Sequence, residues 1–235
     1  MPNYYPVMLD VRGRLTIVVG GDRMAAEKAA GLVSSGADVR VISPQFCDEL
    51  LVQAEHKRVT LQRKAYEPGD LAGAFVVIAA TNDPQLVQAI WSETQERGQL
   101  VNIVDVPERC SFIMPSILRR EPLTIAVSTE GASPSLAKRI RRDLEGIFPP
   151  AYGTYLRLAA LARAHLRQHG VSYDRRDEFF DDFHKSDVLN KLDEGDIPQA
   201  VAITLSLLQR YDIDVSANVL TAGLGEERAY VSSDA

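Results

Sequence analysis

The residues best suited to chemistry in this chain are a lone acid and a glycine pair, each placed after an apolar segment. Asp105 follows residues 100–104, and the two strand-like segments that come next, residues 111–118 and 123–128, carry no charged residue. A carboxylate at such a position takes up a proton or holds a cation. The alternative is that Asp105 only caps the turn before Pro107. Its position favours a functional role.

The glycine pair has the surroundings of a nucleotide-binding turn. Gly20 and Gly21 follow the β-branched segment 15–19, and residues 24–33 have the apolar spacing of a helix. In a βα unit of this kind, glycine lets the backbone approach a pyrophosphate, and the helix start favours its negative charge. The third glycine of a G-x-G-x-x-G motif is missing, and no acid ends the second strand. By itself the motif fits an ordinary tight turn equally well.

A third candidate is the turn formed by residues 128–134, between a predicted strand and a predicted helix. It offers hydroxyl groups and free N–H groups, which suit an anion such as a carboxylate. Thr129, Gly131 and Ser133 are the expected contacts. Ser133 precedes Pro134 and is equally a plain N-cap, which is the interpretation we favour for that residue.

Strands and helices alternate over the first half of the chain and would position these residues. Strands are expected at 15–19, 39–42, 59–63, 75–80 and 100–104, and helices at 24–33, 46–56 and 84–97. This alternation predicts an α/β fold with a Rossmann-like parallel sheet and helices on both faces. Ligands of such sheets bind beyond the carboxyl ends of the strands, where Gly20, Ser43, Thr81 and Asp105 would lie.

The alternation stops at Pro107. Residues 111–118 and 123–128 are expected to form a β-hairpin, joined by the polar turn 119–122. Helices are expected at 133–148, 151–168, 175–185 and 197–210. From residue 211 the composition turns polar and small, which is typical of a loose tail.

Composition and charge exclude several classes of protein. With 46% hydrophobic and 25% charged residues, the 235-residue chain has the composition of a globular protein. The longest apolar run is too short to cross a bilayer and no secretory signal is recognisable, so we expect a cytoplasmic protein without membrane contact. Cys47 and Cys110 have no metal-spaced partner, which argues against zinc and disulfides. Residues 171–235 carry 14 acidic and 6 basic residues, so no nucleic-acid role is expected.

Three segments give the chain a resemblance to a known family. They are IAATND at residues 78–83, VNIVDVPERCSFIMPSIL at 101–118 and PLTIAVSTEGASPSLAKRIR at 122–141. On these motifs the chain resembles the precorrin-2 dehydrogenase and sirohydrochlorin ferrochelatase family, the siroheme synthase N-terminal module, over residues 5–208. The resemblance implies an NAD-binding Rossmann-like domain at 1–112, a hairpin and helix dimerisation region at 113–149, a helical domain at 150–212, a flexible tail at 213–235, and assembly as a homodimer.

The resemblance also implies an activity and a set of site residues. The reaction would be NAD-dependent oxidation of the tetrapyrrole precorrin-2 to sirohydrochlorin, with insertion of Fe²⁺ in some members. The family's essential aspartate falls on Asp105, which would bind metal only transiently in a chelatase, and no resident metal is expected. The cofactor contacts would be Gly20, Gly21, Arg23, Met24, Ser43, Pro44, Gln45, Thr81 and Asn102. The substrate contacts would be Phe112, Pro115, Ser116, Thr129, Gly131 and Ser133.

The cofactor turn departs from the family pattern at two positions. Asp22 stands where the family has a third consecutive glycine, and Glu27 replaces a basic residue. Repulsion between like charges would weaken NAD binding unless Asp22 turns away or pairs with Arg23. The sequence Ser43-Pro44 leaves the choice between NAD and NADP open. Two alternatives follow: a metal chelatase without NAD-dependent activity, and a non-catalytic tetrapyrrole- or nucleotide-binding protein.

Overall fold

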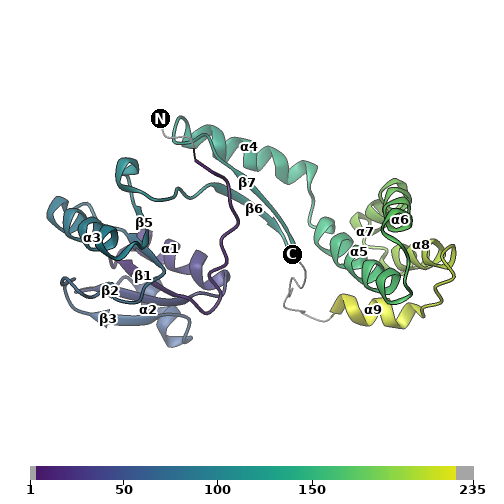
Figure 1. The fold of residues 1–235 in the computed structure, drawn as a ribbon, viewed down its shortest axis with the longest axis horizontal. Coiled ribbons are helices and arrows are strands. Elements are labelled where there is room, and N and C mark those ends of the chain that lie inside the picture. Colours follow the sequence, from purple (N-terminus) through teal and green to yellow (C-terminus); the bar gives the residue numbers. More distant parts are fainter. Residues whose placement is uncertain (1–3, 226–235) are drawn as a thin grey trace. The chain divides into compact units, whose positions relative to one another are not determined.

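The structure is a computed structural model that describes residues 4–225, and the chain divides into two compact units (Figure 1). The first unit extends to Met114 and includes Glu130–Ala132. The second consists of Pro115–Thr129 and the chain from Ser133 onward. The hairpin region and the helical domain expected at 150–212 therefore belong to one compact unit.

The first unit is built on a five-stranded parallel sheet with the strand order β3-β2-β1-β4-β5. Its strands are β1 (Leu15–Val19), β2 (Asp38–Ser43), β3 (Thr60–Arg63), β4 (Val76–Ala79) and β5 (Leu100–Ile103). The register aligns Val19 with Ile42 and with Ala79, so the carboxyl ends of three neighbouring strands meet at one edge. The predicted Rossmann-like sheet is confirmed.

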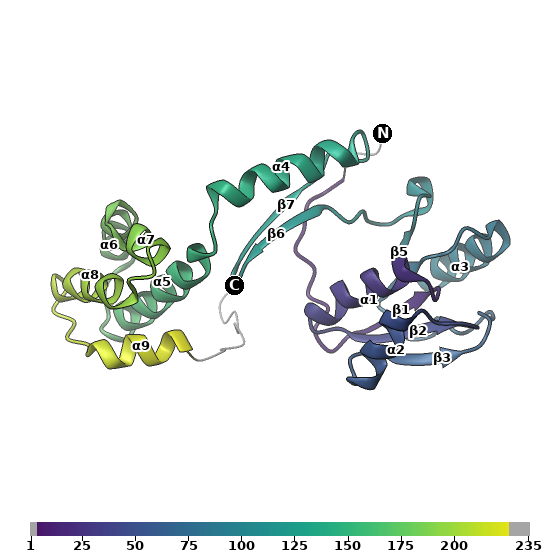
Figure 2. The same cartoon turned by 180° about the vertical axis from the view of Figure 1, so that it is seen from behind.

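Helices cover both faces of this sheet because successive strand residues point to opposite sides. Val18 belongs to a buried cluster with α1 (Arg23–Ser34) and α2 (Asp48–Glu55). Ile17 and Val19 belong to a second cluster with α3 (Pro84–Arg97), on the other face. These three helices and the sheet can be followed in Figure 2. The strands are therefore buried on both faces, as their almost continuous apolar sequences require.

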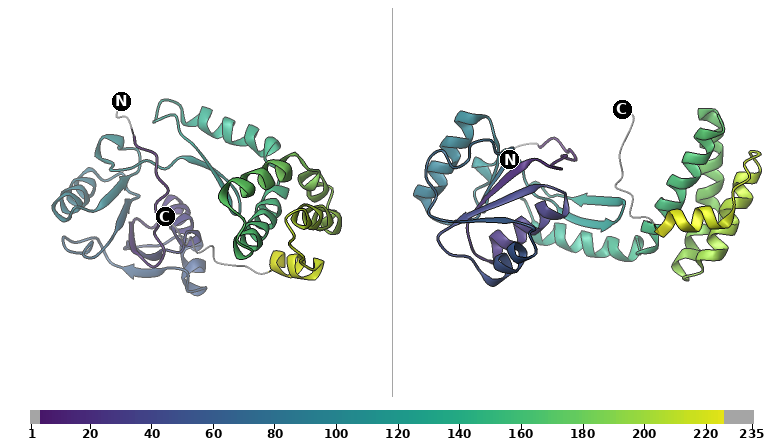
Figure 3. Two further views of the ribbon diagram at one scale, coloured as in Figure 1. Left: turned by 45° about the vertical axis from the view of Figure 1, so that its right-hand side comes forward. Right: turned by 90° about the horizontal axis from the view of Figure 1, so that it is seen from below.

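The second unit begins with an antiparallel hairpin of β6 (Ser116–Arg120) and β7 (Leu123–Val127), along which α4 (Pro134–Ile147) packs (Figure 3). The predicted first strand, at 111–118, starts too early. Ser111 instead bonds to β5: its N–H donates to the Val101 carbonyl at 2.8 Å, and its hydroxyl oxygen accepts from Val101 N at 3.2 Å. The short 3₁₀ helix η1 (Pro107–Arg109) precedes this segment.

Helices make up the rest of the second unit. They are α5 (Ala151–Gln168), α6 (Tyr173–Lys185), α7 (Val188–Asp193), α8 (Ile197–Gln209) and α9 (Ala217–Gly225). Their core includes Leu158, Phe179, Phe183 and Leu208, all fully buried. None of the helices between residues 4 and 225 has the length and hydropathy of a membrane-spanning helix.

The expectation of a flexible tail from residue 213 is wrong for residues 213–225. Ile213 and Leu220 are buried in the helical core, and Gly223 lies so close to Leu161 that an added Cβ would be 2.8 Å from a methyl carbon of that side chain. The small residues that suggested a loose tail permit this close packing instead. Residues 226–235 of the expected tail lie outside the described residues.

Candidate dinucleotide site

A cavity of about 680 Å³ opens at the carboxyl edge of the sheet, within the first unit. Its walls are the turns after β1, β2 and β4, the loop that joins β3 to β4, and the first turns of α3. It brings together five of the predicted cofactor residues: Gly20, Gly21, Ser43, Pro44 and Thr81. Its volume lies in the range typical of small-molecule sites, and its place is the one that ligands occupy in open α/β sheets.

The glycine turn is closely packed against its neighbours. Gly20 has φ +142°, and a Cβ there would lie 2.3 Å from the Ala80 carbonyl oxygen. A Cβ on Gly21 would lie 1.8 Å from the Gln45 carbonyl oxygen, and the Gly21 carbonyl accepts a 2.7 Å hydrogen bond from the Cys47 N–H. Only glycine fits either position. The turn therefore presents bare backbone to the cavity beside the start of α1, which fits a pyrophosphate group.

Carboxylates already cap the two helix starts at this cavity. Asp22 Oδ1 accepts a 2.9 Å hydrogen bond from the Ala25 N–H at the start of α1. Asp83 Oδ1 accepts from Gln85 N at 2.9 Å at the start of α3. Arg23 lies 3.7 Å from Glu49 of α2 and does not pair with Asp22. In the described part of the chain, the charged residues that line the cavity are these two aspartates, and no lysine or arginine lines it.

A buried carboxylate on α3 holds the loop that forms one wall. Glu93 accepts hydrogen bonds from the Tyr66 hydroxyl at 2.5 Å, Gly69 N at 2.9 Å and Leu71 N at 3.3 Å, and it pairs with Arg97 Nε at 2.9 Å. Burial acts to raise the pKa of Glu93, but these hydrogen bonds outweigh it and the pKa is lowered. Burial and the bond to Glu93 raise the pKa of Tyr66. The loop is thereby fixed as a wall of the cavity.

Sequence reasoning missed several parts of this cavity. Tyr66 and Pro68 contribute to it from a loop that carries no recognisable motif, and Glu93 lies 27 positions from the hydroxyl it binds. An acidic residue inside a helix normally indicates a solvated face, so no sequence signal distinguished Glu93 from Glu96 of the same helix. Asp22 was visible as a departure from the family pattern, but neither it nor Asp83 was recognisable as a wall of the cavity.

Asp105 lies at the carboxyl edge of the sheet, as predicted, but it is not among the residues that line the cavity. Its side chain is exposed, and its φ of +60° places the backbone in the left-handed region that non-glycine residues rarely adopt. The turn is closed by a hydrogen bond from Val106 N to the Ile103 carbonyl at 3.2 Å. The catalytic role of Asp105 stays a prediction.

The thiol of Cys110 forms hydrogen bonds that stabilise the turn carrying Asp105. Its sulfur accepts from Ile103 N at 3.2 Å and lies 3.3 Å from the carbonyl oxygens of Ile103 and Val106, either of which can accept its single proton. Burial raises the pKa of this half-buried thiol, so it keeps its proton as a donor. Asn102, a predicted cofactor contact, donates its side-chain amide to the Phe112 carbonyl at 2.9 Å and lies outside the cavity.

The other predicted residues are spread over both units. Arg23, Met24 and Gln45 adjoin the glycine turn without lining the cavity. Of the predicted substrate contacts, Phe112 and Gly131 belong to the first unit and Pro115, Ser116, Thr129 and Ser133 to the second. Ser133 is the N-cap of α4, with its oxygen 3.3 Å from Leu136 N, so the N-cap interpretation is confirmed. The Thr129 oxygen accepts from Ser133 N at 3.1 Å.

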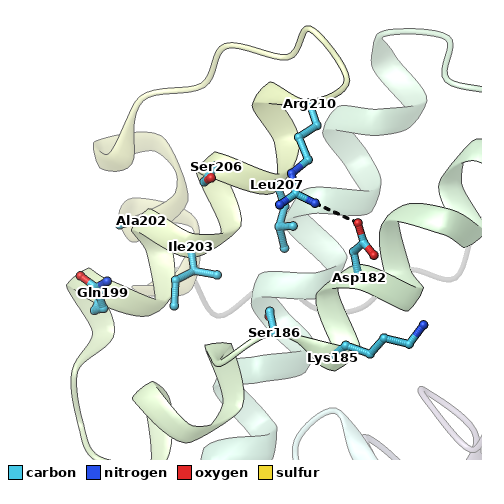
Figure 4. A pocket seen from close by; sticks show the side chains of 9 residues that line it. All are labelled: Asp182, Lys185, Ser186, Gln199, Ala202, Ile203, Ser206, Leu207 and Arg210. Carbon is cyan, nitrogen blue, oxygen red and sulfur yellow. Dashed lines mark hydrogen bonds and ion pairs between the residues drawn. The ribbon is translucent and has the colours of Figure 1, made fainter.

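A second cavity, of about 520 Å³, lies within the helical unit between α6 and α8 (Figure 4). Ile203 and Leu207 line it, and Arg210 pairs with Asp182 at 3.0 Å across its rim. No predicted site residue belongs to it. Among residues 4–225, no three His, Cys, Asp or Glu side chains are grouped so that they could hold a metal ion.

Comparison with known proteins supports the dinucleotide site. A family model described as putative NAD(P)-binding matches residues 7–116, and a second, for the central part of a sirohaem biosynthesis protein, matches residues 120–147. The chain is 34% identical to a siroheme synthase of Photorhabdus laumondii over 95% of this chain and 48% of that protein. It is also 32% identical to a siroheme synthase of Nitrosococcus oceani, over 94% of this chain and 47% of that protein. The chain thus spans about half the length of these relatives.

A solved structure extends the likeness to the whole fold. The protein titled "SirC, precorrin-2 dehydrogenase" matches with a TM-score of 0.69 and 27% identity, over 89% of this chain and 99% of that one. The sheet order, the cavity and the family model define an NAD(P)-binding protein of the Rossmann type. More specifically, the chain belongs to the siroheme synthase N-terminal module family, the family that its sequence motifs indicated.

Proposed function

We propose that this protein oxidises precorrin-2 to sirohydrochlorin with NAD. The proposal depends on one observation above all: the chain shares the fold of a solved precorrin-2 dehydrogenase over 89% of its length, and its cavity lies where that type of fold binds a dinucleotide. Because the siroheme synthases are about twice as long as the matched region, the proposal concerns only the step attributed to this module.

The chain's own residues would hold the cofactor as follows. The backbone of Gly20 and Gly21 would face the pyrophosphate, Ser43 and Pro44 after β2 would border the ribose, and Thr81 would contribute from the turn after β4, the other neighbour of β1. Arg23, Met24, Gln45 and Asn102 remain proposed contacts from outside the cavity walls. NAD, when bound, supplies the hydride acceptor for the oxidation. The protein supplies position and charge.

Asp105 would take up the proton that leaves the substrate. It is exposed, so a macrocycle has access to it, and the hydrogen bonds of Cys110 fix the turn on which it stands. Positioned acid and base groups contribute about 10²- to 10⁴-fold to a rate. Phe112, Pro115, Ser116, Thr129, Gly131 and Ser133 are proposed to contact the substrate.

An anaerobic assay of precorrin-2 oxidation with NAD tests this role. The Asp105→Ala variant should lose about 10²-fold or more in kcat, whereas Glu108→Ala, which removes an exposed acid from the neighbouring 3₁₀ helix, should keep the wild-type rate. Full NAD-dependent activity in Asp105→Ala would show that this carboxylate does not carry the proton.

The proposed functional form is a homodimer. Helix α4 exposes Leu136, Ile140 and Ile147 on one side, and the hairpin exposes Ile117. The four side chains are between 37% and 62% exposed, which is unfavourable in water and suits burial against a second copy. In analytical ultracentrifugation, Ile140→Asp should shift the protein to a monomer and Lys138→Asp, on another side of α4, should not. A wild-type monomer would contradict the proposal.

The acidic cavity favours one second candidate, a metal chelatase without NAD-dependent activity. Asp22 and Asp83 repel a dinucleotide, whereas exposed carboxylates such as Asp105 suit the transfer of Fe²⁺. Titration calorimetry with NAD separates the two functions. Absence of binding at millimolar NAD, together with metal insertion into sirohydrochlorin, would favour the chelatase. Turnover of precorrin-2 with NAD would exclude both it and a non-catalytic binding protein.

A further inference from the structure

We propose that Asp22 sets the affinity of the cavity for its dinucleotide, because its carboxylate occupies the helix-start N–H group that the pyrophosphate would otherwise receive. The inference rests on the proposed function, in that it assumes a pyrophosphate-containing cofactor at the glycine turn. It adds a residue that determines how tightly this chain holds that cofactor.

The first step concerns the hydrogen bond. Asp22 has an extended backbone, with φ −88° and ψ −177°, and its Oδ1 lies 2.9 Å from Ala25 N. The residues that follow it, Ala25 and Ala26, are buried against the sheet, so the start of α1 is held in place. A pyrophosphate oxygen can accept from Ala25 N only when the Asp22 carboxylate gives up this bond. Binding is therefore an exchange of one anion for another.

The second step concerns charge. Asp22 and the glycine turn border the same cavity, and the neighbouring cation, Arg23, is 90% exposed and lies beside Glu49. Asp83 at the start of α3 adds a second carboxylate, while no lysine or arginine in the described part of the chain lines the cavity. A displaced Asp22 carboxylate would stay within several ångströms of the doubly negative pyrophosphate. Repulsion between like charges at such a distance weakens the affinity for the dinucleotide by about tenfold or more.

Two substitutions separate the hydrogen bond from the charge. Asp22→Asn keeps a side chain that caps helices as well as aspartate does, but it removes the charge. Asp22→Gly removes the charge and also frees Ala25 N. Asp196→Asn is the matched control, because Asp196 caps α8 in the helical unit in the same way, with Oδ1 3.1 Å from Gln199 N. Thermal unfolding of each variant confirms that it is folded.

NAD is titrated into the full chain by calorimetry. The expected result is a Kd about tenfold lower in Asp22→Asn than in the wild type, a Kd at least as low in Asp22→Gly, and no change in Asp196→Asn. Raising the salt concentration should tighten NAD binding to the wild type by screening the repulsion, and the effect should shrink in Asp22→Asn.

Three outcomes would overturn the inference, and they are distinguishable from failure of the proposed function. Equal affinities in the wild type and both Asp22 variants would show that this carboxylate does not limit binding, while leaving the dehydrogenase proposal intact. Weaker binding in both variants would show that Asp22 helps to hold the cofactor. Absence of NAD binding in every protein, including Asp22→Gly, would reject the cofactor part of the proposed function as well.

Discussion

Replacement of Glu93 by alanine tests whether the buried carboxylate holds the cavity wall. The substitution removes the acceptor of the Tyr66 hydroxyl, Gly69 N and Leu71 N, and the ion-pair partner of Arg97. Removal of one partner from a buried charged network costs about 3 to 5 kcal/mol. Buried donors left without an acceptor contribute about 1 to 3 kcal/mol each. The Arg97 side chain is 41% exposed, so water can solvate its charge after the carboxylate is removed, which limits the loss. We therefore expect the free energy of unfolding to fall by about 3 to 5 kcal/mol.

Trp91 provides the measurement, because it is the only tryptophan in the chain and lies on α3, in the first unit. Urea unfolding followed by its fluorescence reports on the unit that contains Glu93. Titration with NAD should also show weaker binding, since Tyr66 and Pro68 line the cavity. Glu96→Ala on the same helix is the control, as Glu96 is exposed and should change the stability by less than about 0.5 kcal/mol.

A fall of less than about 1 kcal/mol in Glu93→Ala would refute this reasoning. It would show that the loop is held by its own turns and not by the buried carboxylate. Unchanged NAD affinity in a variant that is clearly destabilised would show instead that the loop forms a wall without influencing the cofactor.

Three further predictions concern the same unit. The pKa of Glu93 is lower in the folded protein than its unfolded value of 4.5, so ionised Glu93 contributes its full stability above pH 4.5. This contribution is lost as the pH falls through the folded pKa. When the protein is acidified, the decrease in unfolding free energy measured by Trp91 fluorescence should therefore be smaller in Glu93→Gln than in the wild type. Gly21→Ala should destabilise the unit by about 1 to 3 kcal/mol and weaken NAD binding, measured by urea unfolding and calorimetry, whereas Gly31→Ala, with open space around it, should be neutral or stabilising. Cys110→Ala should lower the unfolding free energy by about 1 to 3 kcal/mol and reduce kcat, and Cys110→Ser should restore part of both. Wild-type stability and kcat in Cys110→Ala would show that the thiol does not stabilise the turn that carries Asp105.

The parallel sheet and its covering helices were predictable from the sequence because they follow from local patterns. Strands β1, β2 and β4 are short segments rich in β-branched residues, each of the three is followed by a helix, and right-handed crossovers leave few arrangements. The same logic placed Gly20, Ser43 and Thr81 at one edge, where the cavity brings them together. Where the ends of parallel strands can be predicted, the sheet edge at which the site lies can therefore be predicted too.

The remaining features depend on contacts that leave no local pattern. The bond between Tyr66 and Glu93 joins a loop to a helix interior, and the displaced start of the hairpin results from the hydrogen bonds of Ser111 to β5. Burial of Leu220 gives α9 its place in the core, although four of the nine residues of this helix are alanine or glycine. The position of Asp105 outside the cavity lining likewise follows from the turn after β5, which sequence periodicity does not describe.

The contact between Gly21 and Gln45 restricts how this site can diverge during evolution. The turn after β1 and the turn after β2 are interlocked, with the Gly21 carbonyl bonded to Cys47 N and no space for a single methyl group between them. A larger residue at position 21 would be tolerated only if the second turn moved in the same step. Drift in cofactor preference is therefore expected to proceed through the side chains around the interlocked turns and to leave Gly21 itself unchanged.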